Sequence, residues 1–126
     1  MNGIDGWAEK AIAGRGILVD YASWAAEQKI QYDATATRAI TANELKAILT
    51  SKGIQPRPGD ILILRTGYVP AYVNLNASAK ESLASEGPRW PGLEQDEDMV
   101  RWLWEQQFAA IVADNPGLEC VRKYLH

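Results

Sequence analysis

Hydrophobic residues recur along the first part of the chain in two spacings, one helical and one typical of buried strands. Residues 7–12 carry apolar side chains at helical spacing, which predicts a short helix that Asp5 caps and Gly14 ends. An apolar run over residues 16–21 predicts a buried strand. A short helix over residues 22–28 is expected to follow it.

The middle of the chain contains the clearest signals. Residues 30–39 form a polar connector without a regular period, and Thr41 then opens a helix. Thr41 and Glu44 have the spacing of a capping box, and Gly53 suits a left-handed cap at the other end of that helix. Consecutive bulky apolar residues within 60–65 predict a central strand covered on both faces.

Helix and strand patterns continue to alternate toward the end of the chain. Residues 77–86 and 96–107 are expected to be helical, and a loop rich in proline and glycine, residues 87–93, lies between them. Residues 108–113 predict another buried strand, and residues 117–126 show no regular pattern. This alternation predicts an α/β protein with short helices packed around a mixed or partly parallel sheet.

Composition places the chain among ordinary globular proteins. It has 126 residues, 47% hydrophobic and 23% charged, without an internal repeat or a domain boundary, which predicts a single domain over residues 1–126. The net charge is -3 and no basic run occurs, so we expect neither a nucleic-acid nor a membrane partner.

The single cysteine and the lack of long apolar segments in the sequence both favour the same cellular compartment, the cytoplasm. Cys120 is the single cysteine and cannot form an internal disulfide, which favours a reducing environment. No segment approaches the roughly 18 apolar residues of a membrane span, and no signal-peptide pattern opens the chain. We therefore expect a cytoplasmic protein.

Polar residues follow three predicted strands, over residues 20–21, 65–68 and 114–116. Ligands in open α/β sheets bind outside the carboxyl ends of the strands, so parallel strands would bring these residues to one edge. A carboxylate pair there, Asp20 and Asp114, could bind a metal or transfer protons. The alternative is that both carboxylates cap the turns that follow them.

Two further positions have a functional and a structural interpretation. Trp90 and its neighbours in the loop over residues 90–93 could contact a substrate, because tryptophan offers a flat apolar surface with one donor; the loop could equally cover the core. His126 could be a metal ligand or a base, or a terminal residue without a role. No zinc-type cluster of cysteine and histidine occurs in the sequence.

The order of several motifs resembles the cyclase family, which includes the kynurenine formamidases. The segments concerned are 14–21, 58–68, 87–93 and 102–116, so the resemblance covers nearly the whole chain and is nearest to the longer, fungal branch of the family. Their order and spacing together indicate an internal-to-C-terminal segment of such a hydrolase, with a partial cyclase-like fold.

This resemblance implies hydrolysis of an amide or related carbonyl bond, in the conversion of tryptophan to kynurenine or in secondary metabolism. It implies a divalent metal, zinc or manganese, that polarises the carbonyl and activates water, and a homo-oligomer. A small-molecule substrate or ligand is the expected partner. The candidate substrate-binding residues are Arg65, Thr66, Tyr68, Trp90, Pro91, Asp114 and Asn115.

The chain departs from the family pattern in its metal ligands. The family's main ligands come from a His-x-Gly-Thr-His-x-Asp type of motif that would precede Gly14, and this sequence contains nothing like it. His126 matches a later family histidine and is the one candidate metal ligand and catalytic residue. Three hypotheses follow: a hydrolase completed by ligands from elsewhere, a non-catalytic binder of a small ligand, or an interaction module.

Overall fold

The computed structural model describes residues 4–121. Helices and strands alternate, as the sequence predicts, and the fold is α/β. None of the helices in residues 4–121 is long and apolar enough to cross a bilayer. The elements are α1 (Asp5–Lys10), β1 (Gly16–Asp20), α2 (Tyr21–Glu27), β2 (Arg38–Ile40), α3 (Ala42–Ser51), β3 (Ile61–Arg65), α4 (Tyr68–Val73), α5 (Ala77–Ser85), β4 (Pro91–Leu93), α6 (Glu97–Glu105) and β5 (Ala110–Ala113).

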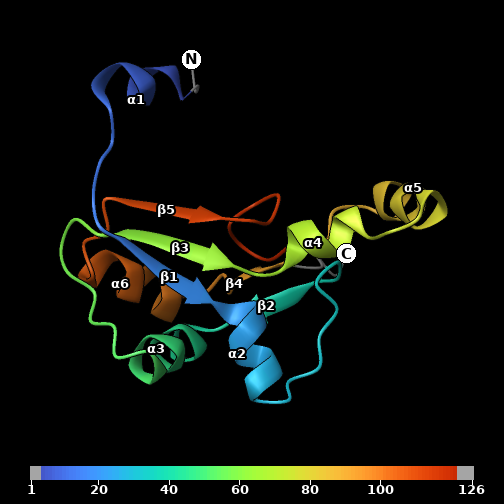
Figure 1. Ribbon diagram of the computed structural model, residues 1–126, viewed down its shortest axis with the longest axis horizontal. Helices are drawn as coiled ribbons and strands as arrows, with labels where there is room; N and C mark the ends of the chain where they lie inside the picture. Colours follow the sequence, from blue (N-terminus) through green and yellow to red (C-terminus); the bar gives the residue numbers. More distant parts are fainter. Residues whose placement is uncertain (1–3, 122–126) are drawn as a thin grey trace.

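Three strands form a parallel sheet in the order β1-β3-β5. Val19 pairs with Leu64, and Leu64 pairs with Ala113, so side chains at one level of the sheet share a face. The arrowheads of the three strands point the same way, toward α2 and α4 (Figure 1). The carboxyl ends of the strands therefore share one edge.

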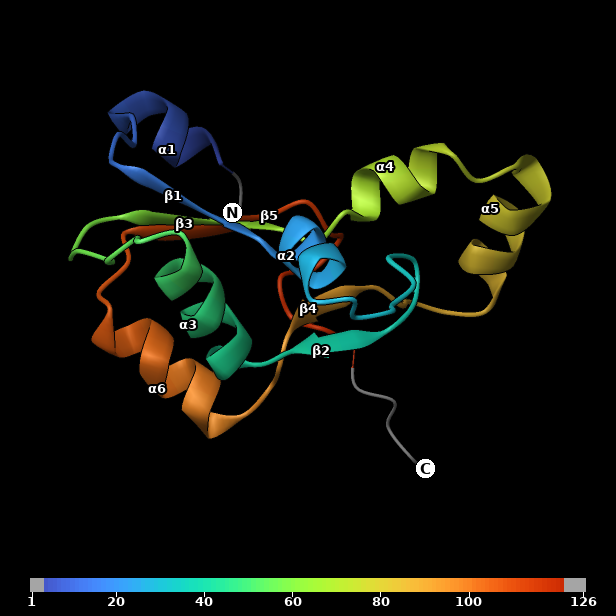
Figure 2. The same ribbon diagram turned by 60° about the horizontal axis from the view of Figure 1, so that its bottom comes forward.

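The core lies on one face of this sheet, between the strands and the helices α3 and α6 (Figures 1 and 2). The strands contribute alternate residues that are almost fully buried, among them Val19 and Leu64. Leu45 and Ile48 of α3 and Met99 of α6 pack against them. Removing a core leucine side chain of this kind typically costs about 2–5 kcal/mol, so this face holds the domain together.

The opposite face of the sheet is open, which corrects the prediction of a strand covered on both faces. Leu18, Ile63 and Val112 pair across the three strands in one row, and their exposed fractions are 47%, 37% and 44%. The sequence pattern cannot distinguish this case, because the bulky residues of residues 61–64 alternate between a covered and an uncovered face.

The helix α3 begins as the sequence predicts. Thr41 Oγ1 accepts a hydrogen bond from the Glu44 amide at 3.1 Å, and a Glu44 carboxylate oxygen accepts one from the Thr41 amide at 2.8 Å. Gly53 follows the end of the helix with a φ of 65°. The other Glu44 oxygen accepts from Arg38 and Tyr21, which ties the helix start to β2 and α2.

The expected cap of the first helix is not formed. Ile4 occupies the N-cap position, and Asp5 lies in the first turn, where its charge still favours the helix dipole. The helix ends at Lys10, and its C-cap is Ala11, which has a φ of 54°, rather than Gly14. Gly14 instead lies in the linker to β1, where a Cβ would be 3.2 Å from the Gly59 carbonyl oxygen.

Three elements, β2, β4 and α4, escaped the sequence analysis. Residues 91–93 form the strand β4, which pairs in parallel with β2, where a loop and a connector were expected. A Cβ at Gly92 would be 2.6 Å from the Cys120 amide nitrogen, so the close approach of residues 118–120 requires glycine there. The helix α4 follows Gly67, whose φ of 81° turns the chain directly after β3.

Candidate functional site

The three predicted polar stretches lie together at the carboxyl edge of the parallel sheet. Asp20 ends β1, Arg65 ends β3, and Asp114 follows β5. Arg65 Nη1 donates a hydrogen bond to Asp20 at 2.7 Å, and Thr66 donates to Asp114 at 2.6 Å. This edge brings together four of the seven candidate substrate-binding residues: Arg65, Thr66, Asp114 and Asn115.

The Asp114 carboxylate organises the turn after β3. Its Oδ1 accepts hydrogen bonds from the Thr66 amide at 2.6 Å and the Thr66 hydroxyl at 2.7 Å. Its Oδ2 accepts from the Gly67 amide at 2.9 Å. Asp114 therefore caps a turn, although it is the turn after a neighbouring strand and not its own.

Both oxygens of the Asp20 carboxylate also accept hydrogen bonds from protein donors. It accepts hydrogen bonds from the Ser23 amide at 3.0 Å and the Ser23 hydroxyl at 2.9 Å, which makes Asp20 the N-cap of α2. Burial raises the pKa of Asp20, but the hydrogen bonds from Ser23 and Arg65 outweigh it and leave the pKa below its ordinary value. Asp20 is thus ionised and held by donors.

Tyr32 is a site residue that the sequence analysis missed. Its hydroxyl donates a hydrogen bond to the Thr66 carbonyl oxygen at 2.7 Å, and burial raises its pKa to about 12. The Tyr32 ring also meets the Tyr21 ring edge to face, with 5.3 Å between centroids. No local signal marks Tyr32, because it lies in the irregular connector and reaches the edge through tertiary packing alone.

Trp90 and Asn115 fix the chain beside this edge. Asn115 Nδ2 donates to the Pro91 carbonyl oxygen at 2.6 Å, and Trp90 Nε1 donates to the Glu119 carbonyl oxygen at 2.8 Å. A Cβ at Gly117 would be 2.9 Å from the Trp90 ring, so the ring packs directly against that glycine. These contacts hold residues 90 and 91 against the segment of residues 115–119.

A cleft of about 370 Å³ opens next to Trp90. Tyr68 and Tyr72 of α4 stack in it with 5.9 Å between their centroids. Lys80 of α5 stands 5.3 Å from the centre of the Tyr72 ring, and Arg89, which forms an ion pair with Glu86, also lines the cleft. The cleft therefore combines flat aromatic surfaces with two cations, which suits a planar ligand that carries negative charge or carbonyl oxygens.

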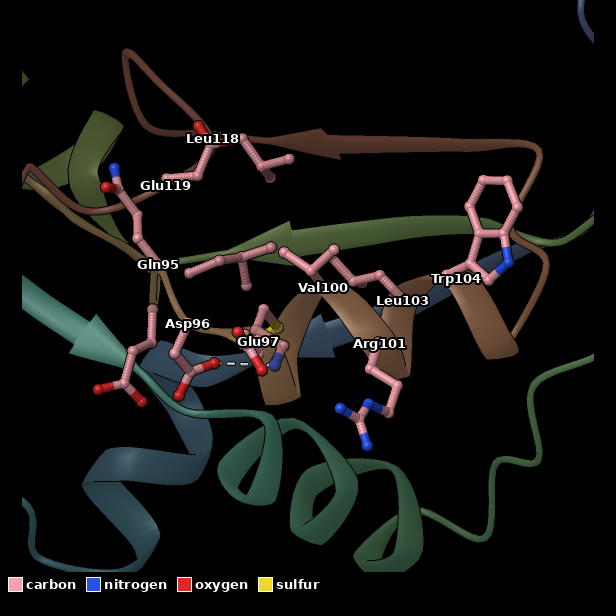
Figure 3. A pocket seen from close by; sticks show the side chains of 12 residues that line it. Gln95, Asp96, Glu97, Val100, Arg101, Leu103, Trp104, Leu118 and Glu119 are labelled. Atoms are coloured by element: carbon pink, nitrogen blue, oxygen red, sulfur yellow. Dashed lines mark hydrogen bonds between the residues drawn. The ribbon is translucent and has the colours of Figure 1, made fainter.

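A larger groove, of about 940 Å³, lies elsewhere, along the outer side of α6 (Figure 3). Its floor is apolar, with Leu93, Leu103 and Leu118, and Val100 and Trp104 stand exposed beside them. None of the seven candidate residues lines it. We therefore place the candidate site at the sheet edge and the aromatic cleft, despite the greater size of the groove.

The described residues do not provide a metal-ligand set. Within residues 4–121, no group of three or more histidine, cysteine, aspartate or glutamate side chains is close enough to hold an ion. Asp20 and Asp114, the carboxylate pair of the metal hypothesis, direct their oxygens to protein donors instead. His126, the candidate ligand and catalytic residue, lies outside the described residues.

Comparison with known protein families identifies the family of this chain. The family model described as "Putative cyclase" matches residues 1–120, so the chain belongs to the cyclase family. Members of this family are generally metal-dependent. No curated protein sequence matches the chain.

Solved structures show the same fold. A crystal structure of a novel cyclase is 32% identical, with a TM-score of 0.71, over 86% of this chain and 33% of its own. Isatin hydrolase A from Labrenzia aggregata, bound to benzyl benzoate, is 20% identical, with a TM-score of 0.58, over 88% of this chain and 38% of its own. This chain therefore spans about a third of the length of each.

Proposed function

We propose that this chain is the substrate-positioning part of a cyclase-family hydrolase that acts on amides or related carbonyl bonds, as the kynurenine formamidases do. Family membership over residues 1–120 supports the reaction class. The observation that carries the proposal is the convergence of Asp20, Arg65, Thr66 and Asp114 at the carboxyl edge of a parallel sheet, next to an aromatic cleft.

Arg65 is the residue best placed to hold a substrate oxygen. Its side chain is 43% exposed, and only Nη1 takes part in the hydrogen bonds to Asp20 and Ser23. Nη2 and Nε remain as donors for a carboxylate or carbonyl oxygen, with the planar geometry that suits such groups. Because Asp20 holds the guanidinium in place, binding would require little ordering of the arginine side chain.

Tyr68 connects this arginine to the cleft. Tyr68 lies three positions after Arg65. Its amide donates a hydrogen bond to the Thr66 hydroxyl at 3.3 Å, and its ring stacks on the Tyr72 ring. We propose that the ring of a substrate stacks in the cleft on Tyr68 and Trp90, with Thr66, Pro91, Asp114 and Asn115 shaping the edge between cleft and strands. Asp114 and Asn115 act by holding the backbone, as their hydrogen bonds indicate.

A bound metal would supply hydroxide near neutral pH and polarise the carbonyl. The residues described here do not fit such an ion, so the proposal assigns them binding and orientation only. Metal ligands would have to come from other parts of an assembly or from a longer protein.

Binding of N-formylkynurenine, measured by isothermal titration calorimetry, tests the proposal. Arg65→Lys keeps the charge next to Asp20 but loses the planar fork, and we expect it to weaken binding roughly ten-fold. Tyr68→Phe keeps the stacked ring and should change binding little, whereas Trp90→Ala should weaken it. Arg101→Lys, on the far helix α6, is the matched control and should bind like the unmodified chain. Equal affinities for Arg65→Lys and Arg101→Lys would refute the assigned site.

A second candidate function is ligand binding without catalysis. It is favoured by the hydrogen bonds that both oxygens of Asp20 and both oxygens of Asp114 already accept from protein donors, which give these carboxylates a positioning role. This candidate would be supported if the chain bound N-formylkynurenine without zinc or manganese and did not hydrolyse it when either metal was added.

A further inference from the structure

The peptide group between Thr66 and Gly67 is held at both ends by side chains from distant parts of the chain. Its carbonyl oxygen accepts a hydrogen bond from the Tyr32 hydroxyl at 2.7 Å, and its N–H, which belongs to Gly67, donates to Asp114 Oδ2 at 2.9 Å. Tyr32 comes from the connector between α2 and β2, whereas Asp114 follows β5 (Figures 1 and 2). The two opposite poles of one peptide plane are therefore fixed independently.

Gly67 by itself does not fix the orientation of this peptide. Its φ is 81°, in the left-handed region, but glycine adopts positive and negative φ about equally readily. The side chains around the turn must therefore select the orientation. A Cβ at Gly67 would be 3.2 Å from the Ala22 Cβ and 3.6 Å from the Tyr32 hydroxyl oxygen, so Tyr32 lies directly against the turn.

The two halves of the candidate site lie on either side of this peptide. Arg65, the proposed donor to a substrate oxygen, directly precedes Thr66, and Tyr68, whose ring lines the aromatic cleft, directly follows Gly67. Because a peptide group is planar, its orientation fixes the ψ of Thr66 and the φ of Gly67 together. A rotation of this peptide would therefore change how the Arg65 guanidinium and the Tyr68 ring face one ligand.

Tyr32 is well placed to act as a donor to this peptide. Its ring packs edge to face on the Tyr21 ring, and burial raises its pKa to about 12, so the hydroxyl keeps its proton at neutral pH. The Tyr21 hydroxyl has different partners: it accepts from Arg38 at 3.0 Å and donates to Glu44 at 3.2 Å. The two neighbouring tyrosines thus hold different parts of the structure.

We propose that Tyr32 is a positioning residue of the substrate site, whose hydroxyl holds the Thr66–Gly67 peptide in the orientation that sets Arg65 and Tyr68 for the same ligand. This inference rests on the proposed function, because it concerns binding at the same site. Tyr32 lies outside the lining of the aromatic cleft, so it acts on the ligand through the peptide and not by contact.

Isothermal titration calorimetry with N-formylkynurenine tests this role. Tyr32→Phe keeps the packed ring and removes only the hydroxyl. We expect it to weaken binding roughly five-fold, because the turn must then become ordered when the ligand binds. Tyr21→Phe is the matched control, since it also loses a hydroxyl with protein partners but leaves the peptide untouched, and it should bind like the unmodified chain. Circular dichroism would verify that both variants fold.

A double variant separates positioning from a general loss of stability. If Tyr32 acts by orienting Arg65, Tyr32→Phe should weaken binding much less in an Arg65→Lys chain than in the unmodified chain, because the oriented group is already altered. Losses from residues that act independently would instead multiply.

Hydrogen exchange measured by NMR on the ligand-free chain tests the peptide itself, apart from any hydrolase function. We expect the Gly67 amide to exchange several-fold faster in Tyr32→Phe than in Tyr21→Phe, because its peptide is then held at one end only.

The outcomes distinguish this inference from the proposed function. No binding by the unmodified chain would overturn the proposed function, and the role of Tyr32 in the substrate site with it. If the unmodified chain binds, three results would each overturn the inference alone: equal affinities for the two tyrosine variants, an undiminished loss in the Arg65→Lys chain, or equal Gly67 exchange in the two tyrosine variants.

Discussion

The Asp114 carboxylate accepts hydrogen bonds from both the amide and the hydroxyl of Thr66, at 2.6 and 2.7 Å. This contact joins the end of β5 to the end of β3 across the carboxyl edge of the sheet. It also places the Gly67 amide at 2.9 Å from the same carboxylate and so sets the direction in which α4 begins. One side chain thus determines the geometry of the turn between the sheet and the aromatic cleft.

Asp114→Asn should destabilise the fold. The asparagine oxygen can still accept from Thr66, but its amide group would face the Gly67 amide, donor against donor. We expect a loss of about 1–3 kcal/mol in the free energy of unfolding, the usual cost of leaving a buried donor without its partner. Urea denaturation at pH 7 measures it. Asp98→Asn, on the exposed start of α6, is the control and should cost much less; similar losses for the two variants would contradict this role.

Asp60 should make stability depend on acid pH. The hydrogen bond and charge of Arg15, together with the Arg57 amide, lower the pKa of Asp60 to about 2, against an ordinary value of 3.8. A folded-state pKa below the unfolded value stabilises the fold above pH 4, and this contribution disappears as the pH falls from 4 toward 2.

Urea midpoints measured between pH 2 and pH 7 test this dependence. Asp60→Asn should be less stable than the unmodified chain at pH 7, and the difference should shrink as the pH falls through this window. Asp98→Asn provides the baseline for loss of a carboxylate without such a partner. A stability difference for Asp60→Asn that stays constant down to pH 2 would argue against the assignment.

Gly92→Ala should be poorly tolerated. The added methyl group would lie 2.6 Å from the Cys120 amide nitrogen and from the Glu119 carbonyl carbon, so backbone would have to move. We expect a loss of about 1–3 kcal/mol in unfolding free energy, typical of overpacking, measured by thermal or urea denaturation. Gly6→Ala is the control because open space surrounds that position, and it should not reduce stability. Equal stability of both variants would disprove the close approach at β4.

Metal binding is expected to be substoichiometric. Because the carboxylates within residues 4–121 that were candidates for an ion bind protein donors instead, dialysis against zinc or manganese followed by elemental analysis should find less than one tightly bound ion per chain. Hydrolysis of N-formylkynurenine by the chain should then be no faster than with the metal salt alone. Metal-dependent turnover that His126→Ala abolishes would refute this prediction and would assign His126 a catalytic role.

Local sequence signals predicted the elements that local interactions determine. The capping box of Thr41 and Glu44 and the left-handed Gly53 depend on residues within a few positions, and the structure has all three as expected. The strand β4 was missed because Pro91–Leu93 looks like a loop, and its pairing partner β2 lies far away in the sequence. No periodicity reports such pairing.

The candidate site divides in the same way. The polar residues at the strand ends could be located because each follows an apolar run, and parallel pairing brings them together. Tyr32 could not be located, since it reaches Thr66 through tertiary packing. The residues of the open sheet face could not be identified either, because Ile63 and Leu64 look alike in the sequence and differ only in what covers them.

The parallel register of β3 with both neighbours has a consequence for how the chain folds. Ile61 pairs with Gly16 on one side and with Ala110 on the other, so every rung of the sheet joins segments that are distant in sequence. Contacts between residues so far apart in the sequence form slowly, because the entropy of closing a long loop is lost before the contacts contribute any stabilisation. During synthesis, β1 and β3 can pair early, but the sheet and the turn that Asp114 holds can be completed only after β5 has left the ribosome.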